Sequence, residues 1–103
     1  MQFDYPHSVG LEDARARVGV LCTYLHNRHG IKVEWEGNTG SFDGKYLMVA
    51  IQGRMTIEDA QIHFDGKDPG MLWRKKAVKY LKEKLAMYLD PNTPIDELPT
   101  DKT

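Results

Sequence analysis

The chain has 103 residues, of which 41% are hydrophobic and 28% charged, and its formal net charge at pH 7 is −1. This length allows one domain, and the near-neutral charge makes a general nucleic-acid binder a poor interpretation. The single cysteine, Cys22, excludes an internal disulfide and a zinc site built from several cysteines.

The first two predicted elements are a short strand and a long helix. Gln2–Tyr5 alternates apolar and polar residues, which indicates a strand, and Pro6 ends it. A helix from about 10 to 29 follows, because apolar residues recur at spacings of three and four. This stripe consists of Leu11, Ala14, Val18, Leu21 and Leu25. Ser8 or Gly10 is its expected N-cap, and Gly30 its C-cap.

Four further strands are predicted between residues 31 and 64. The first, at 31–36, alternates apolar and charged residues and therefore has one wet face. A short strand at Ser41–Phe42 is expected to turn at Asp43 and Gly44. A long strand runs from Tyr46 to Ile57 with a bend at Gly53, and the last covers 61–64.

A second helix is predicted to begin at Asp68 and Pro69 and to end before Pro91. Its apolar stripe comprises Leu72, Val78, Leu81, Leu85, and Tyr88 or Leu89. The order β-α-β-β-β-β-α predicts an α+β fold, in which two helices cover one face of a mostly antiparallel sheet. We expect this domain to span residues 1–89.

Residues 90–103 contain three prolines, four acidic residues and few large apolar side chains. A segment of this composition buries too little surface to balance its ordering entropy. The sequence therefore predicts a flexible acidic tail.

No set of residues in the sequence has the composition of a catalytic site. His26 and His29 stand one helical turn apart, but nothing nearby completes a set of metal ligands. Cys22 lies at the edge of the apolar stripe, as a structural thiol does. We expect no enzymatic activity, no cofactor and no metal.

The predicted second helix is the strongly basic element of the chain. Residues 71–89 contain six basic residues and one acidic residue. The candidates for surface docking are Arg74, Lys75, Lys76, Lys79, Lys82 and Lys84. Lys75, Lys79 and Lys82 fall on one helical face. They dock on an anionic surface, such as lipid headgroups or nucleic-acid phosphate, or they form an ordinary solvated face.

A second candidate is the apolar run from Tyr46 to Ile51, which has no obvious solvent face. Helices can cover one side of such a strand, and a homodimer is a common way to cover the other. The alternative is an apolar ligand pocket between sheet and helices. The candidate residues for interface or pocket are Trp35, Tyr46, Leu47, Met48, Val49 and Ile51.

No apolar stretch approaches the length of a membrane span of about 18 residues, and the first residues do not resemble a signal peptide. We therefore expect a cytoplasmic protein without a transmembrane segment.

Three blocks of sequence resemble a bacterial family, the polyhydroxyalkanoic acid system proteins. These blocks are residues 7–18, beginning His-Ser-Val-Gly-Leu-Glu-Asp, residues 35–38, and residues 53–57. The resemblance covers about residues 5–89. It implies a link to polyhydroxyalkanoate granules but no enzymatic activity, and it carries over no catalytic residue.

The sequence and the resemblance together predict a non-enzymatic accessory protein, associated with polyhydroxyalkanoate granules, that binds a surface or another protein. A granule surface or a granule-associated protein is then the expected partner. The alternative is a small protein that binds an apolar ligand between sheet and helices.

Overall fold

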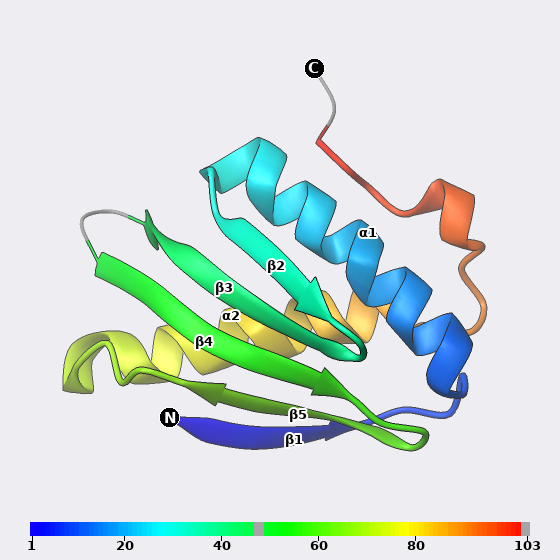
Figure 1. The fold of residues 1–103 in the computed structure, drawn as a ribbon, viewed down its shortest axis with the longest axis horizontal. Helices are drawn as coiled ribbons and strands as arrows, with labels where there is room; N and C mark the ends of the chain where they lie inside the picture. Colours follow the sequence, from blue (N-terminus) through cyan, green and yellow to red (C-terminus); the bar gives the residue numbers. More distant parts are fainter. Residues whose placement is uncertain (47–48, 102–103) are drawn as a thin grey trace.

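The computed structural model describes residues 1–46 and 49–101. Its elements in chain order are β1 (Gln2–Pro6), α1 (Leu11–His29), β2 (Lys32–Glu36), β3 (Thr39–Tyr46), β4 (Val49–Ile57), β5 (Gln61–Gly66), α2 (Met71–Tyr88) and a 3-10 helix, η1 (Ile95–Glu97). Within these residues the strands form one sheet in the order β1-β5-β4-β3-β2, and each neighbouring pair is antiparallel (Figure 1). The predicted α+β class and element order are confirmed.

Helix α1 connects the two edges of the sheet, because it follows β1 at one edge and precedes β2 at the other. It begins after Gly10, whose positive φ of 85° suits glycine, and it ends at Gly30 in the left-handed conformation. The apolar stripe predicted from the sequence is largely buried. Its buried members are Ala14, Val18, Leu21 and Leu25.

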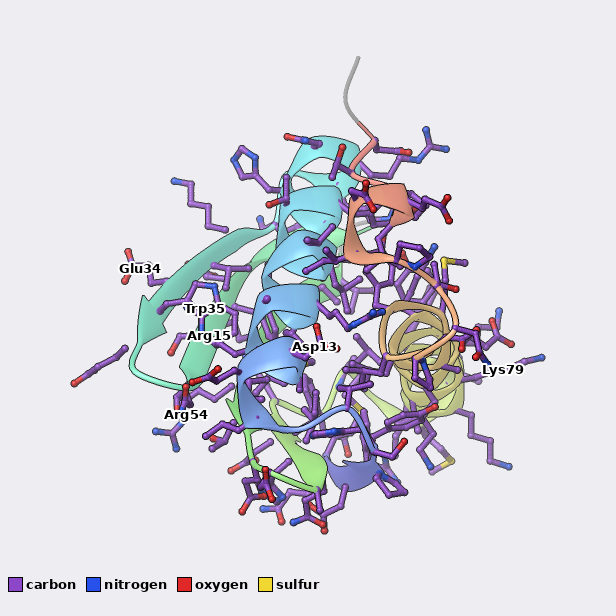
Figure 2. All side chains as sticks on the ribbon, turned by 90° about the vertical axis from the view of Figure 1, so that its right-hand side faces the viewer. Asp13, Arg15, Glu34, Trp35, Arg54 and Lys79 are labelled. Carbon is purple, nitrogen blue, oxygen red and sulfur yellow. The ribbon has the colours of Figure 1, made fainter. Side chains whose placement is uncertain are left out.

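The sheet has one apolar face and one polar face. The cross-strand row Phe3, Phe64, Met55, Gly40 and Trp35 lies on the face that the helices cover. The neighbouring row, on the open face, is Gln2, Asp65, Arg54, Ser41 and Glu34. Figure 2 shows Trp35 on the side of α1, and Glu34 on the opposite side of the sheet. This alternation is the period of two that a half-buried strand requires.

The boundaries of β3 and β4 differ from the prediction. Asp43 and Gly44 do not form a turn, since β3 runs without a break from Thr39 to Tyr46. The backbone of Ile31 approaches Gly44 so closely that an added Cβ would stand 3.0 Å from the Ile31 Cα. Glycine at this position serves close packing rather than a turn. The apolar run predicted as one strand is therefore divided between the end of β3 and the beginning of β4.

Helix α2 also differs in detail from the prediction. It begins after Gly70, and Asp68 accepts a hydrogen bond from the Gly70 amide (2.9 Å). Leu85 and Tyr88 are buried as expected, but Leu72 is 85% exposed. The C-terminal half of α2 thus packs into the core, while its first turns stand away from it.

Residues 90–101 pack against α1, where the sequence predicted a flexible tail. Leu98 follows η1 and is buried in the core. The Tyr88 hydroxyl donates to the Pro99 carbonyl, and the Asn27 side chain donates to the Thr100 carbonyl (2.9 Å). The composition of the segment is polar, but one leucine and several backbone carbonyls suffice to anchor it.

A buried arginine joins α1 to the end of α2. Arg17 is 5% exposed, and its Nε donates to Asp13 Oδ2 at 3.0 Å. Its Nη1 donates to the carbonyl oxygens of Tyr88 (3.2 Å) and Asp90 (2.9 Å). Tyr88 is the last residue of α2 and Asp90 lies two residues beyond it, so Arg17 acts as a side-chain cap for this end of the helix.

Candidate functional site

A cavity of about 420 Å³ lies between the covered face of the sheet and the first turns of α2. Its walls are mainly apolar. They include Ile31, Phe42, Ile51, Phe64, Ala77 and Leu81. The cavity exists because α2 approaches the core only in its C-terminal half, which leaves space beneath its N-terminal half.

The floor of the cavity is formed by two phenylalanine rings. Phe42 and Phe64 stack with their centroids 6.3 Å apart. The Phe64 ring lies against Gly66, where an added Cβ would be 2.7 Å from the ring. A side chain at Gly66 would force the Phe64 ring to move, so the shape of this floor depends on glycine.

The polar groups around the cavity are cationic or neutral. Lys67 and Lys76 line it and are themselves exposed, and Lys76 Nζ lies 5.4 Å from the centroid of the Trp73 ring. His29 Nε2 and the Tyr80 hydroxyl, which also line it, are 3.2 Å apart. Burial and the neighbouring cations Arg28 and Lys84 lower the pKa of His29. No aspartate or glutamate occurs among the described residues that line the cavity.

The structure places two of the predicted pocket residues, Val49 and Ile51, in the wall of this cavity. Trp35 does not line it. The Arg15 guanidinium stacks 3.4 Å from the centroid of the Trp35 ring, between α1 and β2 (Figure 2). Tyr46 ends β3, but its side chain, like Leu47 and Met48, lies outside the described residues.

Sequence reasoning missed most of the cavity, because its walls come from five elements. Trp73 and Ala77 of α2 face Ile31 and Phe64 only through tertiary packing. One signal was available in the sequence, since Trp73 and Ala77 are four residues apart on one helical face.

A second surface is the outer face of α2, which we define as Met71, Leu72, Lys75, Lys79 and Lys82. At 100° per residue these side chains fall within an arc of about 100°. Met71 and Leu72 are 83% and 85% exposed. Figure 2 shows Lys79 on the side of α2 that faces away from α1. The three lysines also border a shallow groove between α2 and Tyr5 of β1.

The other three predicted docking residues point elsewhere. Arg74 pairs with Asp68. Lys76 Nζ lies 5.4 Å from the centroid of the Trp73 ring. Lys84 turns toward α1, where its Nζ donates to the Tyr24 hydroxyl at 3.3 Å. The six cations therefore do not lie on one face of α2. Lys75, Lys79 and Lys82 share the outer face, and Lys82 Nζ lies 5.4 Å from the centroid of the Phe3 ring of β1.

The remaining residues considered in the sequence are a possible nucleophile, Cys22, and two possible metal ligands, His26 and His29. Cys22 is buried, and burial raises the pKa of its thiol to about 12. A thiol with this pKa is not a nucleophile at neutral pH. His26 and His29 belong to no cluster of three potential metal ligands in the described part of the chain.

Comparison with known proteins identifies a family. The family described as "Putative polyhydroxyalkanoic acid system protein" (PHA_gran_rgn) matches residues 1–92. The chain belongs to this family. The match covers every strand and both long helices of this family member, including the cavity and the outer face. No curated protein and no solved structure matches it significantly.

Among the described residues of this family member, no helix is long and apolar enough to cross a membrane.

Proposed function

We propose that this chain is a non-enzymatic accessory protein of the polyhydroxyalkanoic acid system, and that it binds the granule surface through the outer face of α2. The observation that carries the proposal is the exposure of Met71 and Leu72, 83% and 85%, beside Lys75, Lys79 and Lys82. The family description supplies the system.

Met71 and Leu72 are adjacent, and contact with an apolar or amphipathic surface would remove both side chains from water, which is favourable. Their position in the first turn of α2 lets them enter a surface without undocking the helix, because the anchoring residues Leu85 and Tyr88 lie at its other end. The folded protein can thus bind as it stands.

The apolar and cationic groups contribute on a similar scale. A lysine near an anionic surface contributes about 1 kcal/mol. Burial of a leucine or methionine side chain contributes about 1.5–3 kcal/mol. The two apolar side chains alone, or the three lysines alone, give weak attachment, because association also costs translational and rotational entropy. All five side chains together give measurable binding.

The test is co-sedimentation with isolated polyester granules and with vesicles containing phosphatidylglycerol, over a series of salt concentrations. We expect binding that weakens as salt increases, because surface charges are screened. The triple variant Lys75→Glu, Lys79→Glu, Lys82→Glu should lose binding at least tenfold. The double variant Met71→Ser, Leu72→Ser should lose a similar factor at high salt, where the apolar contribution dominates.

The matched control is the triple variant Lys32→Glu, Lys45→Glu, Arg54→Glu. These residues are exposed and belong to β2, β3 and β4, and the variant has the same net charge as the α2 variant. It should bind as the wild type does. Equal sedimentation of the α2 variant and the control would refute binding through the outer face.

A homodimer and a cytoplasmic location stay predictions. The described row across the open sheet face, from Gln2 to Glu34, is polar, so it offers little apolar area to a second copy. Light scattering at tens of micromolar tests self-association.

A further inference from the structure

We infer that the cavity beneath α2 is a binding site for a linear aliphatic carboxylate, with the chain inside and the carboxylate at the mouth between Lys67 and Lys76. This site is separate from the outer face of α2, since Lys75, Lys79 and Lys82 do not line the cavity. Binding of a free ligand here is independent of granule binding.

The size and lining of the cavity fit an aliphatic chain. Its volume of about 420 Å³ falls within the range of roughly 300–1,000 Å³ typical of small-molecule sites. The inner wall is made of side chains without hydrogen-bonding groups, such as Phe42, Phe64 and Leu81. Such a wall favours alkyl groups and disfavours sugars or nucleotides, whose polar groups would lose water without compensation.

The charge at the mouth selects the head group. Lys67 and Lys76 are the charged side chains among the described residues of the lining, and these residues include no aspartate or glutamate. Gln52, His29 and Tyr80 add neutral hydrogen-bonding groups on the same lining. An anion with hydrogen-bond acceptors complements this rim, whereas a cation would be repelled.

Calorimetric titration of the full chain with butanoate, hexanoate, octanoate and decanoate, below their micellar concentrations, tests the chain pocket. We expect one ligand per chain. The affinity should rise about fourfold for each added methylene until the cavity is filled, which is the ratio implied by the transfer of a methylene group from water. Absence of binding by decanoate at millimolar concentration would overturn the proposal.

Two helix variants locate the site. Ala77→Phe places a ring in the cavity and should reduce decanoate affinity more than tenfold. Ala86→Phe, on the same helix but beside the groove at Tyr5, should leave it unchanged. Circular dichroism spectra of both variants should match that of the wild type and so control for folding. Equal affinity of the two variants would show that the ligand lies elsewhere.

The head group is tested with decan-1-ol as the neutral analogue of decanoate. The variant Lys67→Gln, Lys76→Gln should lose about threefold to tenfold in decanoate affinity, as expected for exposed ion pairs, and nothing in alcohol affinity. The control Lys75→Gln, Lys79→Gln removes the same charge outside the cavity and should change neither. Loss of decanoate affinity in both variants alike would attribute the effect to net charge and overturn the assignment of the rim.

The fluorescence of Trp73 gives an independent readout, because this indole lines the cavity and Trp35 does not. Decanoate should change the emission of the wild type and of Trp35→Phe, but not that of Trp73→Phe. Failure of granule binding with intact decanoate binding would refute the proposed function alone, and the reverse result would refute this site alone.

Discussion

Replacement of Arg17 by methionine tests how much the hydrogen bonds of the buried guanidinium contribute to the free energy of unfolding. Arg17 is 5% exposed and spans α1, the end of α2 and the C-terminal segment. Methionine keeps most of the aliphatic stem, so the packing loss is small, and the substitution removes chiefly the hydrogen bonds.

The expected magnitude follows from what is left behind. The Tyr88 carbonyl loses the Arg17 donor, and a buried polar group left without a partner costs about 1–3 kcal/mol. The Asp90 carbonyl keeps a hydrogen bond from the Thr93 amide (3.1 Å) and loses only the bond from the guanidinium, and a hydrogen bond to a charged group contributes about 1.5–3 kcal/mol. The bridge to Asp13 adds little, because that carboxylate is 45% exposed. Relief of the desolvated charge acts in the opposite direction. We expect a net loss of about 2–4 kcal/mol, a large part of the 5–15 kcal/mol typical of a domain.

Urea unfolding followed by circular dichroism at constant m-value measures this loss. A thermal scan should show a decrease in Tm of about 10–20 °C, at the 4–8 °C per kcal/mol usual for small domains. Arg17→Lys should be nearly as destabilising, because an ammonium group cannot reach the same acceptors as a planar fork.

The control is Arg28→Met on the same helix. Arg28 is 63% exposed and lies 3.5 Å from Asp101, so its loss should change stability by no more than about 0.5 kcal/mol. A loss below about 1 kcal/mol for Arg17→Met, or equal losses for the two variants, would contradict the capping role.

Three further predictions concern the C-terminal segment and two titratable groups. Truncation after residue 89 should lower stability by about 2–4 kcal/mol, because it removes Leu98 from the core, and burial of this side chain alone is worth about 1.5–3 kcal/mol; an unchanged urea midpoint would support the flexible tail predicted from the sequence. Cys22, with its thiol pKa raised to about 12 by burial, should resist iodoacetamide at pH 8 in the native state and react in urea; fast native labelling would contradict this. The hydrogen bond from His63 to Asp4 (2.6 Å) raises the pKa of His63, so its stabilising effect is complete below the unfolded pKa of about 6.5 and disappears as pH rises through the folded pKa. Asp4→Asn should lower that pKa in an NMR titration, and an unchanged titration midpoint would exclude the pair.

Local sequence patterns predicted an element correctly where each residue of the pattern has a single structural role. The stripe from Ala14 to Leu25 and the cap at Gly30 predicted α1 to within a residue, because helix periodicity and glycine in the left-handed region are local properties. Local patterns gave the wrong structure where one residue type suits two different structural roles. Gly44 suits a turn and also a close approach between strands, and only the position of Ile31 decides between them.

The candidate site divides in the same way. The grouping of Lys75, Lys79 and Lys82 on one face follows from helical geometry alone, and the structure places them on the side of α2 away from the core. Leu72 was assigned to the same apolar stripe as Leu85, yet it is exposed while Leu85 is buried. Thirteen residues at 100° each place the two side chains about 140° apart, so helical geometry already puts Leu72 on the outer face with the lysines.

The sequence by itself determined the element order, the family and the basic character of α2, since each is carried by residues close together in the chain. The tertiary structure decided which residues distant in the chain contact one another. Arg17 finds acceptors 71 and 73 residues away, and the cavity exists only where five separate elements leave space. Such contacts depend on the angle at which helix and sheet pack, and that angle is set by the sum of many side-chain volumes rather than by any local pattern.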